Sequence, residues 1–356
     1  MFKILNNFAH GRPFNSSTEV RITYICTQRC LQCVIPFKNT HTMTLEEFRR
    51  VMANLRDYGA YVGFISGGET TVVEELPEMM MEANRTFQYA TTLVSGLYNK
   101  PEMIEPSAKV CLENGMHIQT SFDGFGAIGD ELRGCTDYDT TVTERMKMIS
   151  DMRRSIQKKS KKKSLLYANT VISDKNIEQI PDIIAHVKSL GWKSTIGLYH
   201  TLTFSTRYND DMVVRPGERL NKLVQFLKGN PDIMNLDTFV EGIAPYVDNP
   251  NLNWCPFVES KYLSTRTTVM ENGDVHLCKG NPIGNVFNQS LKDIFSSYEY
   301  QRRLDEYSRC EGCWTTCYTQ RYLLVRPKSV SQAVNNIKKL SNTRKIDLKF
   351  RKSFSP

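Results

Sequence analysis

The sequence lacks an unbroken apolar run long enough for a transmembrane helix, which needs about 20 such residues. Its first residues, MFKILNNFAHGRPF, have neither a sustained apolar stretch nor a small-residue cleavage site, so they do not resemble a secretory signal peptide. These absences predict a cytoplasmic protein. In a reducing compartment disulfides are rare, so the ten cysteines of the chain favour metal binding or catalysis where they cluster.

The sequence also has little net positive charge outside its C-terminal end. The formal net charge is +8, but residues 328–356 hold eight basic side chains and one acidic one, which leaves +1 for the rest of the chain. A nucleic-acid-binding domain is therefore not indicated. The basic tail could contact an anionic membrane surface. A second basic run, Arg153–Lys163, is best interpreted as a solvated helix end, with an acidic partner as the alternative.

Short apolar runs alternate with longer segments of helical spacing. This alternation predicts parallel strands joined by right-handed helical crossovers. We expect an α/β fold, a partial (β/α)6 TIM-like open barrel, with its active site at the carboxyl ends of the strands. The predicted strands are Val20–Ile25, Tyr61–Ile65, Thr91–Val94, His117–Phe122, Leu165–Ile172 and Ser194–Tyr199, and the predicted helices span about 44–58, 74–87, 102–114, 140–155 and 177–190.

The repeat stops after His200. Two helices, Glu218–Lys228 and Asp237–Tyr246, are predicted next. The pair Asn272-Gly273 between two β-rich runs predicts a hairpin of 265–270 and 274–277, and a helix is expected over about 291–307. The predicted organisation is an N-terminal lead-in (1–17), the barrel core (18–205), connecting helices (206–254), a cysteine-rich domain (255–320) and a basic tail (321–356).

Cys26, Cys30 and Cys33 lie on one short loop directly after the first predicted strand. A loop of this length keeps three sulfur atoms near one point, where they can bind one metal centre. A 4Fe–4S cluster usually takes four cysteine ligands, so three would leave one iron open to a cofactor or substrate. Zinc is the competing interpretation, because His41 is close enough in sequence to be a fourth ligand.

The spacing CX3CX2C after a first strand resembles the radical S-adenosylmethionine (radical SAM) superfamily. Ser66-Gly67-Gly68-Glu69 follows the second strand, where that family carries a GGE motif that holds the amino group of S-adenosylmethionine (AdoMet). The resemblance implies AdoMet contacts from Gly67, Gly68 and Glu69. Glycines permit close backbone approach, and a carboxylate can accept from an ammonium group.

Weaker correspondences follow further along the chain. By the same resemblance, Ser121 and Asn169 are candidate AdoMet contacts at the ends of the fourth and fifth strands, and Arg133 matches a family position. A purely structural role is an equal alternative for these three residues. The sequence departs from the family at Gln32, where an aromatic residue is common, and at Thr70, where proline is usual. Neither departure removes a ligand, but both put the adenine contact in question.

A second cysteine group follows the predicted hairpin. Its pattern resembles the C-terminal twitch or SPASM extension of radical SAM enzymes, which binds auxiliary iron–sulfur clusters. The full SPASM pattern has seven cysteines, so five imply one auxiliary 4Fe–4S cluster; a four-cysteine zinc site is the alternative. The candidate ligands are Cys255, Cys278, Cys310, Cys313 and Cys317.

The resemblance implies an enzyme that cleaves AdoMet reductively to a 5′-deoxyadenosyl radical and modifies a small molecule or peptide at an unactivated C–H bond. It further implies a flavodoxin- or ferredoxin-type electron donor. Because the stretch before Cys26 is short, we expect no separate leader-peptide-binding domain. Two alternatives remain, a peptide or protein maturase of the SPASM type and a non-catalytic iron–sulfur electron carrier. The sequence identifies neither a catalytic side chain nor the substrate.

Overall fold

The computed structural model describes residues 17–37, 41–157, 163–200, 206–250, 266–310, 312–320, 323, 331–332 and 334–336. Predictions for Cys255, for residues 158–162 of the basic run and for most of the basic tail therefore lie outside the described residues. Within the described ranges, no helix combines the length and hydrophobicity that crossing a bilayer requires.

The described strands form one sheet of nine, in the order β6-β5-β4-β3-β2-β1-β7-β8-β9. From β6 to β7 all neighbouring strands are parallel, whereas β7, β8 and β9 pair in antiparallel fashion. The sheet order has two ends, so the described strands form an open barrel. Their bounds are β1 Thr18–Arg21, β2 Val62–Ser66, β3 Ala90–Val94, β4 His117–Ser121, β5 Leu166–Ile172, β6 Lys193–Leu198, β7 Thr267–Val269, β8 Asp274–His276 and β9 Gly284–Asn285.

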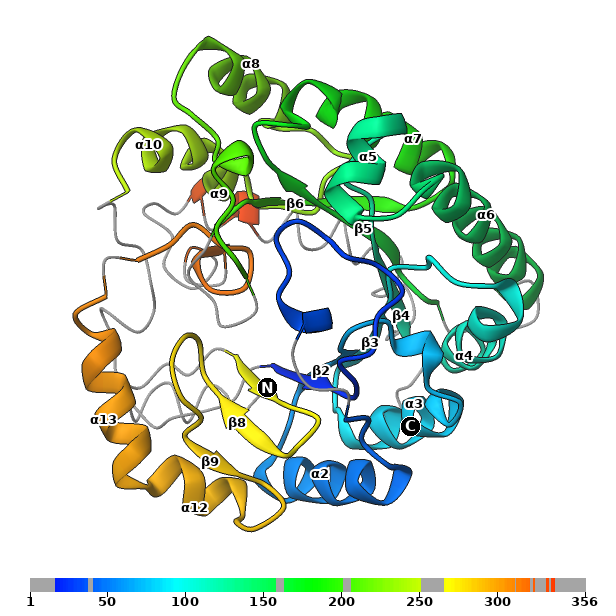
Figure 1. Cartoon of the computed structure of the whole chain (residues 1–356), viewed down its shortest axis with the longest axis vertical. Coiled ribbons are helices and arrows are strands. Elements are labelled where there is room, and N and C mark those ends of the chain that lie inside the picture. Colours follow the sequence, from blue (N-terminus) through cyan, green and yellow to red (C-terminus); the bar gives the residue numbers. More distant parts are fainter. Residues whose placement is uncertain are drawn as a thin grey trace.

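Helices surround this sheet on the outside of a curved ring (Figure 1). They are α2 Leu45–Tyr58, α3 Leu76–Thr86, α4 Pro101–Asn114, α5 Gly126–Arg133, α6 Tyr138–Gln157, α7 Ile180–Ser189, α8 Glu218–Leu227, α9 Asp237–Glu241, α10 Ile243–Asp248, α12 Leu291–Ser296 and α13 Tyr298–Tyr307. Short 3-10 helices occur at η1 Ile35–Phe37, η2 Thr70–Val72, η3 Ile177–Gln179 and η4 Asp210–Met212. The arrangement confirms the predicted α/β open barrel.

Local sequence explains the first crossover helix well. Thr44 caps α2, and its hydroxyl and the Glu47 carboxylate form a reciprocal capping box. Gly59 ends the helix in the left-handed region, with φ of 97°. The buried face of α2, which includes Phe48 and Leu55, packs into the same apolar core as Val20 of β1. Outward-facing strand residues therefore pack on the helices, and alternate residues face the barrel lumen.

Several predicted boundaries need correction. The first strand ends at Arg21 rather than Ile25, because the chain leaves the regular sheet there and enters the cysteine loop. The helix predicted over 237–246 divides at Gly242, and the one over 291–307 divides at Ser297, which caps α13. Helix α5 was not predicted, because Gly126 and Gly129 weaken its helical pattern.

The hairpin predicted around Asn272-Gly273 is confirmed as β7 and β8, but its place in the sheet was not predicted. β7 pairs in parallel with β1, so the sheet of the barrel continues directly into the C-terminal extension. On the outer side, the amide of Asn54 in α2 bonds the Val286 carbonyl oxygen at 3.0 Å and accepts from the Leu291 backbone N–H at 3.1 Å. These contacts fix the extension against the barrel.

The Asn54 contacts predict a stability effect. Asn54→Ala leaves the Leu291 N–H and the Val286 carbonyl oxygen without this partner, so we expect a loss of about 1–3 kcal/mol of unfolding free energy. Denaturant unfolding measures it. Arg50→Ala on the same helix is the matched control, because its ion pair with Glu46 is exposed and should change stability by less than about 0.5 kcal/mol. Equal effects of the two substitutions would contradict this role for Asn54.

Candidate functional site

The three-cysteine loop crosses the central opening of the ring, where Figure 1 shows it as the dark-blue segment. Backbone hydrogen bonds hold it from two sides. On one side, the N–H groups of Arg29 and Leu31 donate to carbonyl oxygens at the end of α5 at 3.2 and 3.0 Å. On the other, the Arg207 N–H donates to the Gln32 carbonyl oxygen at 3.0 Å. The unpredicted helix α5 is therefore a support for the loop.

The thiols of this loop are held partly by their own backbone. The N–H of Gln28 lies 3.5 Å from the Cys26 sulfur, and the N–H of Ile35 lies 3.4 Å from the Cys33 sulfur. Burial raises the pKa of Cys26 and raises that of Cys30 to about 12, while Arg133 acts in the opposite direction on both. Burial thus keeps these two groups as thiols until a metal replaces their protons.

The donor set suits an iron–sulfur cluster with an open iron position. Cys26, Cys30 and Cys33 come from one loop, and each is close enough to the others to affect the thiol pKa values of Cys26 and Cys30. In the described part of the chain, no three His, Cys, Asp or Glu side chains already close around one point as a metal cage. The assignment of these three cysteines as cluster ligands stays a prediction. The alternative, a zinc site with His41 as the fourth ligand, also stays a prediction.

Gly67 and Gly68 bring the end of β2 against the start of the cysteine loop. The Gly68 N–H donates to the Thr23 carbonyl oxygen at 2.7 Å, and the Glu69 N–H donates to the Ile25 carbonyl oxygen at 2.8 Å. A Cβ atom on Gly68 would lie 2.1 Å from that Ile25 oxygen, which is far inside a van der Waals contact. The absence of a side chain at Gly68 therefore lets its backbone pack closely against the segment that leads into Cys26.

The Glu69 carboxylate is buried and already accepts several hydrogen bonds. Its donors are the Thr71 N–H and hydroxyl, the Ser95 hydroxyl at 2.6 Å and the Gly96 N–H at 2.9 Å. This network fixes the carboxylate at the ends of β2 and β3, beside the cysteine loop. An ammonium group bound here would share oxygens that these donors already use, so the contact of Glu69 with AdoMet stays a prediction.

A buried ion pair lies under the loop. Arg133 Nη1 donates to Asp123 Oδ2 at 3.0 Å, and Arg133 Nη2 donates to the Gln28 side-chain oxygen at 3.3 Å. Asp123 also accepts from the Val171 N–H at 2.8 Å. Burial raises the pKa of Asp123, and Arg133 opposes that shift. Arg133 therefore connects α5 and the end of β4 to the cysteine loop, a structural role that sequence reasoning left open.

The two other candidate AdoMet contacts are brought together. Ser121 and Asn169 are register partners on β4 and β5, and the Thr195 hydroxyl of β6 donates to Asn169 Oδ1 at 2.8 Å. All three residues are partly exposed. They form a polar row across three neighbouring strands at the lumen face of the barrel. Contact of Ser121 and Asn169 with a ligand remains a prediction.

In the extension, Cys278, Cys310, Cys313 and Cys317 lie within one region of the described structure. The pKa of Tyr246 is raised to about 12, mainly by burial and to a smaller extent by the nearby Cys313 and Cys310. Both thiols are therefore near that ring. The pKa of Tyr318 is also raised, mainly by burial, then by Cys278 and more weakly by Cys317. Two pairs of cysteines thus flank the packed aromatic residues of this domain. Cys255 lies outside the described residues, and the choice among the five ligands stays a prediction.

A cavity of about 610 Å³ connects the barrel to this cysteine-rich region. Tyr199 and His200 line it at the carboxyl end of β6, and Tyr246, Lys279 and Cys310 line it from the other side. Burial lowers the pKa of His200 to about 4, so its imidazole is neutral at physiological pH. The cavity is large enough for a small ligand or a peptide side chain.

Sequence reasoning missed one polar cluster in the lumen. Glu19 of β1 pairs with Arg21 and with Arg266, and Ser66 donates to it at 2.6 Å. Burial favours a raised pKa for Glu19, but the arginines and the Ser66 hydroxyl outweigh it, and the pKa falls well below its usual range. Alternation of charged and apolar residues in β1 was the available signal, since Glu19 and Arg21 flank Val20.

The fold and this site define an α/β open barrel with a cysteine loop at the mouth and a cysteine-rich extension on the edge of the same sheet. Comparison with known proteins agrees. Residues 255–318 match the family model of the SPASM iron–sulfur cluster-binding domain. A PqqA peptide cyclase of Bradyrhizobium diazoefficiens is 26% identical over 46% of this chain and 41% of the relative. The subtilosin biosynthesis protein AlbA of Bacillus subtilis is 22% identical over 80% and 60%, respectively.

Among solved structures, Streptococcus suis SuiB has the same fold. Its complex with the precursor peptide SuiA matches with a TM-score of 0.64 and 14% identity, over 92% of this chain and 76% of SuiB. The chain spans between 41% and 60% of the length of the two curated relatives. Taken together, the SPASM match and these relatives support the resemblance to radical SAM enzymes with a SPASM-type extension.

The close approach of Gly68 predicts a specific defect. Gly68→Ala places a methyl group against the Ile25 carbonyl oxygen, so we expect the cysteine loop to shift and bound iron to fall to less than about half after anaerobic reconstitution. Gly197→Ala in β6 is the control, because a Cβ atom there has open space. Iron analysis checks both variants. Full iron binding by Gly68→Ala would contradict the role of this contact.

The buried ion pair predicts a large stability loss. Arg133→Gln leaves the Asp123 carboxylate buried without its counter-charge, so we expect a loss of about 3–5 kcal/mol in denaturant unfolding at neutral pH. Arg154→Gln breaks an exposed pair with Asp151 and should cost less than about 0.5 kcal/mol. The double variant Asp123→Asn/Arg133→Gln should recover part of the loss. If Arg133→Gln were as stable as the control, the pair would not support the loop.

Proposed function

We propose that this chain is a radical SAM enzyme that modifies a peptide substrate. The observation that carries the proposal is the cysteine loop at the mouth of the barrel, supported by α5 and joined to the Gly67-Gly68-Glu69 segment. The relatives and SuiB support a peptide substrate, because PqqA peptide cyclase acts on a peptide and SuiB was solved with a precursor peptide.

The residues of the loop fit the cofactors of that family. Three cysteines would hold a 4Fe–4S cluster and leave one iron for AdoMet. When bound, this cluster supplies the electron that splits the sulfonium–carbon bond of AdoMet, which yields a 5′-deoxyadenosyl radical. An external donor of the flavodoxin or ferredoxin type would supply that electron.

The protein's own contribution is positioning and exclusion of water. Glu69 is held by Ser95 and Gly96 at the edge of the loop, where it can accept from an ammonium group if one of its present donors gives way. Ser121 and Asn169 belong to the polar row on the neighbouring strands β4 and β5. Both sets of groups would orient AdoMet between the cluster and the barrel.

The extension would hold an auxiliary 4Fe–4S cluster. Cys278, Cys310, Cys313 and Cys317 are candidate ligands, together with Cys255. The cavity beside Cys310 reaches the carboxyl end of β6, so a substrate held there would lie against the cysteine-rich extension.

Turnover of AdoMet tests the proposal. With dithionite, the anaerobically reconstituted chain should release 5′-deoxyadenosine, and Cys30→Ala should lower this release by more than about 100-fold, because the cluster loses a ligand. Cys111→Ala is the control, since Cys111 is buried in α4 and away from both sites. An iron count of about eight per chain supports two clusters. Full iron content without release of 5′-deoxyadenosine would instead identify an electron carrier.

A further inference from the structure

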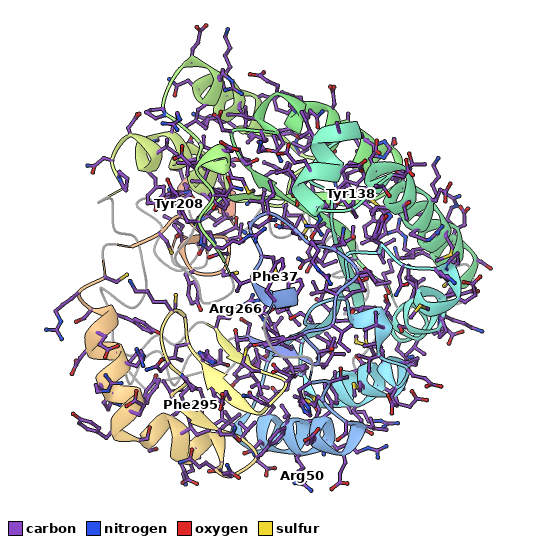
Figure 2. All side chains as sticks on the ribbon, viewed as in Figure 1. Phe37, Arg50, Tyr138, Tyr208, Arg266 and Phe295 are labelled. Atoms are coloured by element: carbon purple, nitrogen blue, oxygen red, sulfur yellow. The ribbon has the colours of Figure 1, made fainter. Side chains whose placement is uncertain are left out.

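The cavity at the carboxyl end of β6 is lined by two chemically different walls. Its charged lining residues, Lys279, Glu306 and Arg309, all come from the extension. The described lining residues from β6 to α10 are valines, tyrosines, one leucine, one proline and one histidine. Figure 2 shows Tyr208, which belongs to this second wall, in the region of α9 and α10. The barrel side of the cavity therefore suits an uncharged part of a ligand.

Two tyrosines of this wall use their hydroxyl groups within the protein. The Tyr199 hydroxyl donates to the Arg207 carbonyl oxygen at 2.8 Å and accepts from the Asn209 N–H at 2.8 Å. The Tyr208 hydroxyl donates to Asp210 Oδ1 at 2.8 Å. These bonds fix both rings, and they leave the rings rather than the hydroxyl groups to contact a ligand.

His200 is a polar side chain of the same wall that makes no hydrogen bond to the described residues. It follows β6 after Tyr199, is partly exposed and lines the cavity. Its Nδ1 atom is enclosed and has no hydrogen-bond partner in the described part of the chain. Nε2 is not enclosed in this way, and no described residue bonds it either. The imidazole therefore keeps hydrogen-bonding capacity for a molecule in the cavity.

The enclosed Nδ1 atom indicates which nitrogen of His200 carries the proton. Burial lowers the pKa of His200 to about 4, so the ring is neutral at physiological pH and has one N–H group. A proton on Nδ1 would leave an enclosed donor without an acceptor, at a cost of about 1–3 kcal/mol. Unpaired donors are also rarer in protein interiors than unpaired acceptors. The proton is therefore assigned to Nε2, which presents a neutral donor to the cavity.

The shape and chemistry of the wall select among the side chains of a peptide. A volume of about 610 Å³ accommodates an aromatic side chain, and the rings of Tyr199, Tyr208 and Tyr246 offer edge and face contacts to it. A charged side chain would lose its hydration against this wall without gaining a counter-charge. A phenol combines an aromatic ring with an oxygen that accepts from an N–H donor. Tyrosine is therefore the side chain that uses both the rings and the imidazole.

We propose that this cavity is a subsite for a tyrosine side chain of the peptide substrate, and that His200 Nε2 donates a hydrogen bond to its phenol oxygen. The subsite rests on the proposed function for its occupant. His200 determines specificity here, because the aromatic walls alone would hold phenylalanine and tyrosine equally well.

Three short peptides test the donor role without any substitution in the protein. They are N-acetyl-Ala-Tyr-Ala-amide and its O-methyltyrosine and phenylalanine counterparts. Saturation-transfer NMR on the reconstituted full chain in the presence of AdoMet gives each Kd. The tyrosine and O-methyltyrosine peptides should both bind on the order of fivefold tighter than the phenylalanine peptide, because both keep an oxygen that accepts from Nε2.

Three variants locate the interaction. His200→Phe should bind all three peptides alike, and as tightly as the wild-type chain binds the phenylalanine peptide, which also shows that the variant is folded. Tyr246→Phe is the matched control, because it removes another hydroxyl from the same cavity and should leave the preference unchanged. Val247→Trp narrows the cavity from the half-buried side of α10, so it should weaken all three peptides on the order of tenfold.

Equal affinity of the wild-type chain for the three peptides would overturn the subsite. A tyrosine peptide that binds tighter than both others would also overturn it as stated, because His200 would then accept rather than donate. The same holds for a preference that survives His200→Phe, or for unchanged binding by Val247→Trp. Release of 5′-deoxyadenosine is measured on the same samples. Its absence alongside the predicted preference would reject the proposed function and leave the subsite in place, whereas release without the preference would do the reverse.

Discussion

The geometry of the site depends on how a loop without regular structure is held in one shape. The cysteine loop receives backbone hydrogen bonds from α5 on one side and from Arg207 on the other, while Gly68 lets β2 meet its first residues. Backbone donors cannot change with rotamer, so they fix the loop more firmly than side chains would. The path of the loop backbone is therefore set by the barrel elements that surround it.

Buried charges around the loop follow two different rules. Asp123 and Arg133 neutralise each other, and Glu69 is surrounded by neutral donors, so both arrangements stabilise the fold by themselves. Glu19 is surrounded instead by two cations.

Much of this could be read from the sequence. Hydrophobic periodicity located the six barrel strands, and Asn272-Gly273 located the hairpin, because local chemistry determines such elements. The pairing of β1 with β7 could not be read, since it joins residues about 250 positions apart and leaves no local pattern. Arg266 was missed for the same reason. The close approach of Gly68 to Ile25 was equally hidden, because a motif shows which residues permit contact and not what they touch.

The continuous sheet also constrains movement between the barrel and the extension. β1 has parallel neighbours on both sides, β2 from the barrel and β7 from the extension, so the two cysteine regions are joined by backbone hydrogen bonds. Moving the extension away from the barrel would break the backbone hydrogen bonds between β1 and β7. The N–H and C=O groups of both strands would then lack their partners. The shared strand pairing therefore restrains the extension from moving as a separate body, and the spacing between the two cysteine regions is set by the sheet itself.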